Sequence, residues 1–177
     1  MADGRSRPRV AVSSCLLGEA VRYDGEHKCN DGVIELLSAH FEGVPVCPEV
    51  AIGMGVPRPP IRLVKLEAGI RARGVEDASH DVTQLLQAFA RQCVVQLAGV
   101  SGYIFKSRSP SCGLSDTDLF NADGGLLGKT AGIFSAMIHE RLPELPVIDE
   151  HQLEDPVQRD AFVQQVRDYH AKQRGGR

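Results

Sequence analysis

The chain has 177 residues, of which 42% are hydrophobic and 24% are charged, and it contains no tryptophan. A formal net charge of -3 argues against a nucleic-acid-binding protein, because such proteins usually carry a basic surface. No apolar run approaches the roughly 20 residues that cross a bilayer, and the polar start of the chain contains no apolar signal core. We therefore expect a cytoplasmic protein with no membrane contact and a single domain at residues 9–172, between a flexible N-terminus at 1–8 and a flexible tail at 173–177.

Strands and helices alternate along the chain in the pattern of an α/β protein. Runs rich in β-branched residues predict strands at 9–15, 44–47, 61–66, 69–73, 102–106 and 145–148. Apolar residues at helical spacing predict helices at 31–40, 81–98 and 130–141, and a last helix that begins at Asp155. We expect a Rossmann-like three-layer fold with a small parallel sheet, a short β excursion at 61–74, and a loop at 114–128.

Two helix starts have recognisable caps. Asn30 or Asp31 precedes the helix at 31–40, and either side chain can accept a backbone hydrogen bond. Asp81 with Gln84 three residues later resembles a capping box at the start of the helix at 81–98.

The segment from Val44 to Val50 (VPVCPEV) reads as a short buried strand that runs into a loop. Proline cannot continue an interior ladder, so Pro48 marks the end of the strand. In an extended backbone Cys47 and Glu49 project to the same side, because side chains alternate with a period of two. A thiol and a carboxylate would then share one small space at the carboxyl end of a strand, where ligands bind in open α/β sheets.

The five cysteines, at 15, 29, 47, 93 and 112, are odd in number and widely spaced, which does not suggest a disulfide framework. Cys93 lies on the apolar stripe of a predicted helix and is expected in the core. Cys29 precedes a helix, whereas Cys15, Cys47 and Cys112 each follow a strand. If those strands are neighbours, three thiols converge at one sheet edge; otherwise the cysteines are unrelated reduced thiols. Three thiolates suit a soft metal centre, and on an iron–sulfur cube they would leave one iron open.

Two further loops carry candidate site residues. Arg22 and Asp24 could contact a ligand or could pin their own loop by an ion pair. Arg58 lies among prolines and would be held out, either towards an anionic ligand or into solvent. The loop at 107–113 is polar and is conformationally restricted by Pro110, which suits a binding site better than a spacer.

At these residues the sequence resembles a known family, the bacterial 2-thiouracil desulfurases. The similar segments are Val12–Gly18, Val21–Gly25, Val46–Val50, Pro57–Pro60, and Lys106 with Ser109–Gly113. They extend from about Arg9 to Ile148. The loop from Gly53 to Val64 is similar to a branch of the family in which this domain is fused to a second, C-terminal domain.

The resemblance implies an oxygen-sensitive [4Fe-4S] cluster held by Cys15, Cys47 and Cys112. It implies a desulfidase that removes sulfur from a thiolated nucleobase such as 2-thiouracil and releases sulfide. Glu49 would activate water and Ser109 would assist proton movement, as the two catalytic residues. The expected substrate-binding residues are Ser14, Asp24, Arg58, Lys106 and Ser111.

Other functions stay open on the sequence alone. A carboxylate beside a metal, such as Glu49, can be a structural partner, so the chain could be a non-catalytic metal- or cluster-binding accessory module in sulfur metabolism. A metal-free sulfur transferase with one nucleophilic cysteine is the third possibility.

Overall fold

A parallel sheet of four strands forms the centre of the molecule. The structure, a computed structural model, describes residues 6–175. The strand order of the sheet is β2-β1-β5-β8, and every pair in it is parallel. Its strands are β1 (Arg9–Ser13), β2 (Glu42–Val46), β5 (Gly102–Phe105) and β8 (Val147–Asp149).

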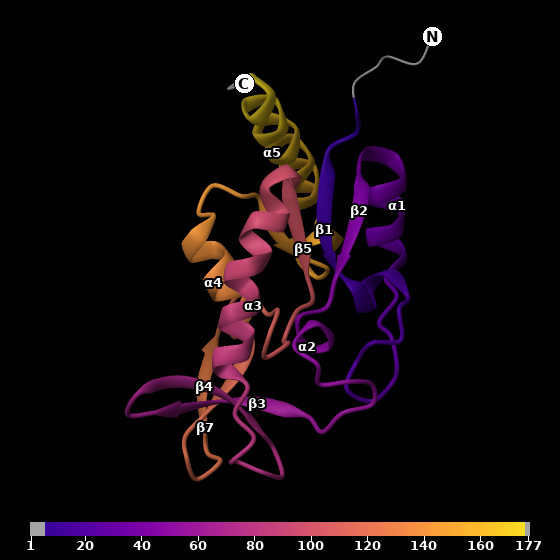
Figure 1. Cartoon of the computed structure of the whole chain (residues 1–177). Coiled ribbons are helices and arrows are strands. Elements are labelled where there is room, and N and C mark those ends of the chain that lie inside the picture. The colour runs from indigo at the N-terminus through magenta and orange to yellow at the C-terminus, as the bar shows by residue number, and fades with distance from the viewer. Residues whose placement is uncertain (1–5, 176–177) are drawn as a thin grey trace.

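Helices cover both faces of this sheet, so the expected three-layer α/β fold is confirmed (Figure 1). The alternation of side chains along β1 explains the layers, because Val10 and Val12 pack on one face and Ala11 on the other. One face is covered by α1 (Asp31–His40) and α5 (Pro156–Gly175). The opposite face is covered by α3 (Thr83–Gln96) and α4 (Ile133–Arg141).

A second sheet lies beyond the carboxyl ends of the central strands (Figure 1). Its order is β4-β3-β6-β7, from β3 (Ile61–Leu66), β4 (Gly69–Gly74), β6 (Thr117–Phe120) and β7 (Leu126–Thr130). The predicted excursion at 61–74 is the β3–β4 hairpin, which belongs to this separate sheet rather than to the edge of the first. The expectation of a loop at 114–128 is wrong, because β6 and β7 form a hairpin there. Residues 121–125 are the turn of that hairpin, and β6 is too short to show a periodic signal.

The strand before Cys47 was predicted to be buried, but the structure places it at the edge of the sheet. β2 is an edge strand, and none of its five residues is fully buried. Pro45 explains this position, because a proline within a strand lacks the N–H that an interior ladder needs on both sides. β-branched composition thus identified the strand but not its exposure.

The ends of the helices agree with the sequence-based expectation at α1 and differ from it at α3 and α4. Asn30 does cap α1, since its Oδ1 accepts a bond of 3.0 Å from the Val33 N–H. Asp81 forms no capping box with Gln84; it accepts the Thr83 N–H and binds two arginines of β4 instead. The helix α4 begins three residues later than predicted, because Gly128–Thr130 belong to β7.

Parts of the two predicted flexible ends make contacts with the domain. The helix α5 continues to Gly175, and the Ser101 hydroxyl donates to Gln173, so residues 173–175 belong to the last helix. At the other end, Arg7 bonds backbone carbonyls of α1 and the Pro8 carbonyl accepts the Glu42 N–H. The remaining residues of these two ranges, 1–5 and 176–177, lie outside the described part of the chain.

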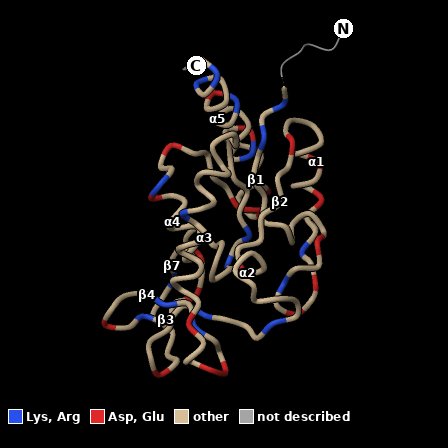
Figure 2. The backbone as a smooth tube through the Cα atoms, viewed as in Figure 1, with Lys and Arg blue, Asp and Glu red and all other residues tan. Residues whose placement is uncertain are grey.

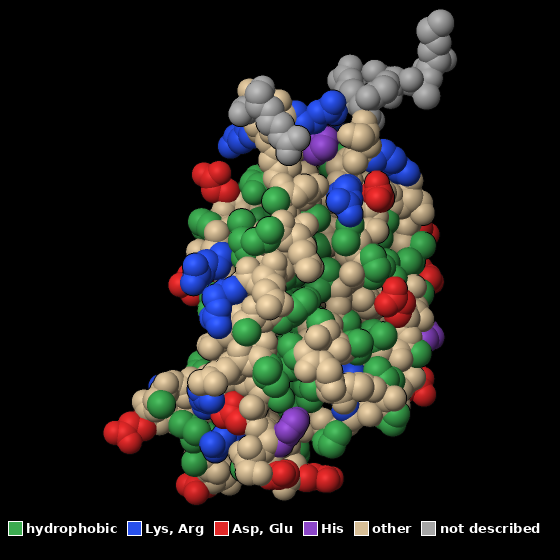
Figure 3. Space-filling view, in the orientation of Figure 1, with side chains coloured by type: hydrophobic (Ala, Val, Ile, Leu, Met, Phe, Trp, Pro, Cys, Tyr) green, Lys and Arg blue, Asp and Glu red, His purple; other side chains and the backbone are tan. Residues whose placement is uncertain are grey.

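Charged residues of both signs are distributed over all parts of the backbone (Figure 2). Apolar side chains gather on the face that α3 presents, with Leu85 and Val95 of that helix exposed (Figure 3). Exposed apolar side chains of this kind are ordinary on soluble domains. Within residues 6–175 no helix is both long and apolar enough to span a membrane.

The acid sensitivity of the second sheet follows from Asp81. Burial raises the pKa of this carboxyl, but hydrogen bonds from Arg71 and Thr83 outweigh burial and lower the pKa to about 2. Because the folded-state pKa lies below the ordinary 3.8, the carboxylate stabilises the fold at neutral pH, and this contribution is lost as the pH falls towards the lower value. Asp81→Asn should therefore lower the free energy of unfolding by about 2 kcal/mol at neutral pH.

Urea unfolding of the wild type and the variant, measured over a series of pH values, checks this expectation. The difference between the two proteins should shrink steadily below about pH 4. Asp160→Asn, at an exposed position of α5, is the control. A difference that stays constant across the acid range would contradict the assignment.

Candidate functional site

A cavity of about 440 Å³ opens at the carboxyl edge of the central sheet. It lies where the strand order reverses, because the chain continues from β1 to β2 on one side and later to β5 on the other. Such switch points are where open α/β sheets bind ligands. Nine of the ten residues expected from the sequence line this cavity: Ser14, Cys15, Cys47, Glu49, Arg58, Lys106, Ser109, Ser111 and Cys112.

The three thiols reach the cavity from three different strand ends. Cys15 lies in a short 3-10 helix (Ser14–Leu17) directly after β1, and Cys47 joins β2 to the short helix α2 (Pro48–Ala51). Cys112 lies in the loop that follows β5. All three are free thiols, and Cys15 and Cys112 are buried. The convergence expected for these cysteines is therefore present in the structure.

Burial makes these thiols hard to ionise. It raises the pKa of Cys15 to about 11; the Lys106 ammonium acts against this, and the neighbouring Cys47 adds to it. Burial also raises the pKa of Cys47, although the Val50 N–H at the start of α2 partly offsets it. The pKa of Cys112 is raised most strongly, again by burial, despite a hydrogen bond with Ser13. The three thiols are thus protonated at neutral pH, and a negative charge on Cys47 would further oppose ionisation of Cys15 and Cys112.

Backbone hydrogen bonds hold the cysteine loops in place. The Cys15 carbonyl accepts the Lys28 N–H at 2.9 Å, and the Leu16 carbonyl accepts the Asn30 N–H at 3.1 Å. The segment before α1 is therefore fastened to the segment after β1.

Ser109 organises the loop that carries Cys112. Its Oγ accepts the N–H groups of Ser111 at 3.2 Å and Cys112 at 3.0 Å. The loop also packs tightly on the start of α4, because a Cβ at Gly132 would lie 2.5 Å from the Ser111 carbonyl oxygen. Only glycine permits this close approach.

Glu49 shares the cavity with Cys47, but not for the reason that an extended backbone suggested. Glu49 is the second residue of α2, so the expected alternation with Cys47 does not apply. Its Oε2 accepts the Arg58 Nε–H at 2.7 Å, and its Oε1 accepts the Ser111 hydroxyl at 2.8 Å. The carboxylate is therefore fixed from two sides by residues distant in the chain.

Arg58 is buried, with 7% of its surface exposed, which excludes the alternative in which it points into solvent. Besides the Glu49 carboxylate, its guanidinium binds the carbonyls of Val21 at 2.8 Å and Gly55 at 2.9 Å. Arg58 thus joins three loops around the cavity. Its partners are protein groups rather than open space.

Asp24 is the one expected site residue outside the cavity lining. It forms an ion pair of 3.6 Å with Arg22, which does line the cavity, and it accepts the Glu26 N–H. Of the two interpretations left open by the sequence, the structure shows the ion pair that pins the loop.

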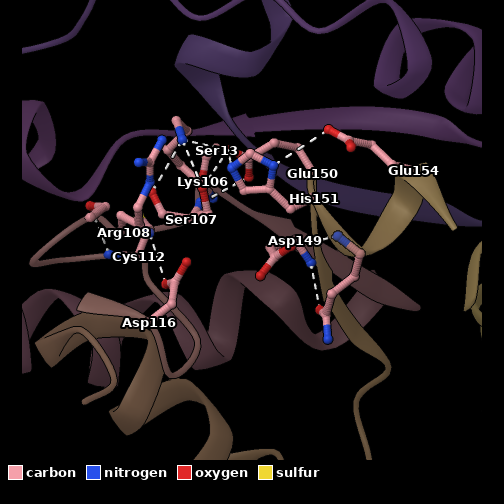
Figure 4. A network of polar contacts seen from close by, with 12 residues as sticks. Ser13, Lys106, Ser107, Arg108, Cys112, Asp116, Asp149, Glu150, His151 and Glu154 are labelled. Carbon is pink, nitrogen blue, oxygen red and sulfur yellow. Dashed lines mark hydrogen bonds and ion pairs between the residues drawn. The ribbon is translucent and has the colours of Figure 1, made fainter. Parts of the chain in front are cut away.

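Sequence reasoning missed a polar network that connects Ser13, Lys106 and Ser107 of the cavity lining to Glu150 behind them (Figure 4). Glu150 is buried and binds both Lys106 and Ser107. A signal was available, since Asp149 and Glu150 directly follow the last predicted strand at 145–148. The rule that polar groups after strand ends meet at one edge applied there as well as at the cysteines.

The donor set of the cavity consists of three thiols that reach it from three separate segments of the chain. Within residues 6–175 no three His, Cys, Asp or Glu side chains lie close enough together to hold one metal ion. Thiolates are the usual protein ligands of iron–sulfur clusters, so the residues present are of the type that such a cluster uses.

Comparison with known proteins places this geometry in a family. The family model for 2-thiouracil desulfurase matches residues 10–150. The chain belongs to the 2-thiouracil desulfurase family. A solved structure of the [4Fe-4S]-dependent thiouracil desulfidase TudS is similar to it, with a TM-score of 0.65 and 28% identity over 84% of this chain and 94% of that one. The uncharacterized protein YbbK of Bacillus subtilis is 29% identical over 155 residues, which are 82% of this chain and 98% of YbbK.

The contact between Gly132 and Ser111 gives a test of how the Cys112 loop is held. Gly132→Ala should force the loop away from α4 and lower the free energy of unfolding by roughly 1–3 kcal/mol. Thermal unfolding checks this, with Gly99→Ala as the control, since the nearest atom to a Cβ there is 3.9 Å away. Equal stability of the two variants would show that the loop is not held by this contact.

Proposed function

We propose that this protein is a desulfidase that converts the C=S group of a small thiolated base to C=O and releases sulfide, using a [4Fe-4S] cluster on Cys15, Cys47 and Cys112. The observation that carries the proposal is the meeting of three thiols and one fixed carboxylate in a single cavity. Membership of the 2-thiouracil desulfurase family supports it. The likeness to TudS supports the cluster and the thiolated substrate.

The residues present suit such a cluster. Thiolates are the usual ligands of iron–sulfur clusters, and the three thiols line one cavity from three segments that follow parallel strands. When bound, a cluster with three protein ligands supplies one open, Lewis-acidic iron that a soft sulfur atom can approach.

Glu49 is suited to hold and deprotonate the attacking water. A carboxylate has about four acceptor sites, and Arg58 and Ser111 occupy one on each oxygen, so each oxygen can accept one more hydrogen bond. Water that donates to Glu49 would add its oxygen to the thiocarbonyl carbon as its proton moves to the carboxylate. The carbon–sulfur bond then breaks, and sulfur leaves as sulfide without any change of oxidation state.

Ser109 is suited to the proton transfer that completes this exchange. Its Oγ accepts two backbone N–H groups, and neither bond uses the hydroxyl hydrogen. That hydrogen can therefore move towards the leaving sulfur, and the hydrogen that the water leaves on the carbon-bound oxygen replaces it as the C=O group forms. Ser14, also buried on the cavity wall, would shape the space for the base.

Cations predominate in the cavity wall and favour a negative charge on the leaving sulfur. Glu49 is the single carboxylate in the lining, against five basic side chains: Arg22, Lys28, Arg58, Lys106 and Arg108. Positive charge in a site shielded from water stabilises charge that develops during a reaction.

Replacing each proposed ligand tests the cluster. Anaerobic reconstitution of the wild type should give a brown protein with about four irons and four sulfides per chain. Cys15→Ser, Cys47→Ser and Cys112→Ser should each lose most of this iron, as measured by metal analysis and visible absorbance. Cys93→Ser is the matched control, because Cys93 is a buried thiol of α3 outside the cavity. A colourless wild-type protein would refute the proposal.

Replacing Glu49 separates catalysis from cluster binding. Glu49→Gln should retain the visible absorbance of the cluster but release sulfide from 2-thiouracil about 100-fold more slowly, since a general base contributes at least this much. Glu42→Gln, at an exposed position of β2, is the control. Sulfide release is measured without oxygen. An intact cluster with no turnover even in the wild type would instead indicate an accessory module.

A further inference from the structure

An ion pair joins the buried Glu150 to Lys106, a partly buried residue of the cavity lining (Figure 4). Glu150 is 5% exposed at the end of β8, and Lys106 directly follows β5, its neighbour in the sheet. The expected role of Lys106 was to contact the substrate. Its hydrogen bonds indicate a different role.

All three ammonium hydrogens of Lys106 have acceptors within the protein. These acceptors are a carboxylate oxygen of Glu150, the Ser107 carbonyl at 3.1 Å and the Ser107 hydroxyl at 3.0 Å. A lysine ammonium has three donors and no acceptor. In this arrangement Lys106 therefore has no hydrogen left for a ligand, although its charge faces the cavity.

Glu150 holds this arrangement from the other side. Its Oε2 accepts the Ser107 N–H at 2.8 Å, and its Oε1 accepts the Ser107 hydroxyl at 2.7 Å. The backbone N–H of Lys106 donates to the Ser13 hydroxyl at 2.9 Å. One carboxylate thus fastens the ends of β8 and β5 together, and Ser13 extends the connection to β1.

We propose that Glu150 is a positioning residue that holds Lys106 in the cavity wall as a fixed positive charge, so that Lys106 does not serve as a hydrogen-bond donor to the substrate. This inference rests on the proposed function, in which negative charge develops on the leaving sulfur. A fixed cation favours that charge in the transition state and contributes little to binding of the neutral base. Glu150 acts only through Lys106 and Ser107.

A double-mutant cycle tests the pairing without any turnover. Glu150→Gln and Lys106→Met each leave one buried charge without its partner and should each lower the melting temperature by about 10 °C. The double variant has neither charge and should recover most of this loss. The matched control is Glu154→Gln, because Glu154 lies near Glu150 but is exposed. Additive losses in the double variant would overturn the pairing.

Measurements of ligand binding and of turnover then distinguish two roles of Lys106, a fixed positive charge and a hydrogen-bond donor to the substrate. In reconstituted protein, the Kd for uracil, the expected product, should stay within about twofold of the wild type in Lys106→Met and Glu150→Gln. Their kcat for sulfide release from 2-thiouracil should fall at least about tenfold, and the double variant should be no slower than either single variant. Glu154→Gln should change neither quantity.

Two results would overturn the proposal. Weaker uracil binding with an unchanged kcat would show that Lys106 donates to the ligand, and an unchanged kcat in both single variants would show that the pair is only structural. Failure of the proposed function is a different result, in which the wild type itself releases no sulfide. The melting temperatures and uracil affinities would still decide how Glu150 and Lys106 act.

Discussion

Parallel pairing of β1 with β2 on one side and β5 on the other is the constraint on which the whole site depends. The register places Ser13 opposite Val46 and Val12 opposite Ile104, so the three strands end at one level. The register is fixed in turn by packing, since a slip of one residue would turn Val10 and Val12 away from α1 and α5. Cysteines that are remote in the chain meet only because ordinary apolar packing aligns the strands that precede them.

The cavity built on this edge pairs its buried charged groups and keeps its thiols neutral. Glu49 is held by Arg58, and Lys106 is held by Glu150. Such pairing is what burial of charge requires, because an unpartnered ion in a protein interior is strongly destabilising. Burial raises the pKa of the three thiols, and thiols give up their protons when they bind a metal. The same cavity can thus be stable without a metal and still offer three thiolates to one.

Much of this arrangement was predictable from the sequence, for physical reasons that also set the limit. β1 showed as a β-branched run and β5 as a short run with two aromatic residues and Ile104. Cysteines after strand ends indicated the shared edge because parallel strands end together. Glu49 was placed correctly on a wrong premise, since the proline at 48 begins a helix rather than a loop. The partners of charged residues were not predictable. Arg58 and Glu150 meet their ion-pair partners through tertiary packing, which leaves no periodic pattern in the sequence. The strand β6 was missed for another reason, since it is too short to show a periodic pattern.

Iron anomalous scattering from crystals of the anaerobically reconstituted protein would test the central claim most directly. The expected result is a single group of four iron positions in the cavity, three of them bonded to the sulfurs of Cys15, Cys47 and Cys112 and the fourth without a protein ligand. Iron bound elsewhere, or a fourth side chain such as Glu49 closing the last iron, would contradict it.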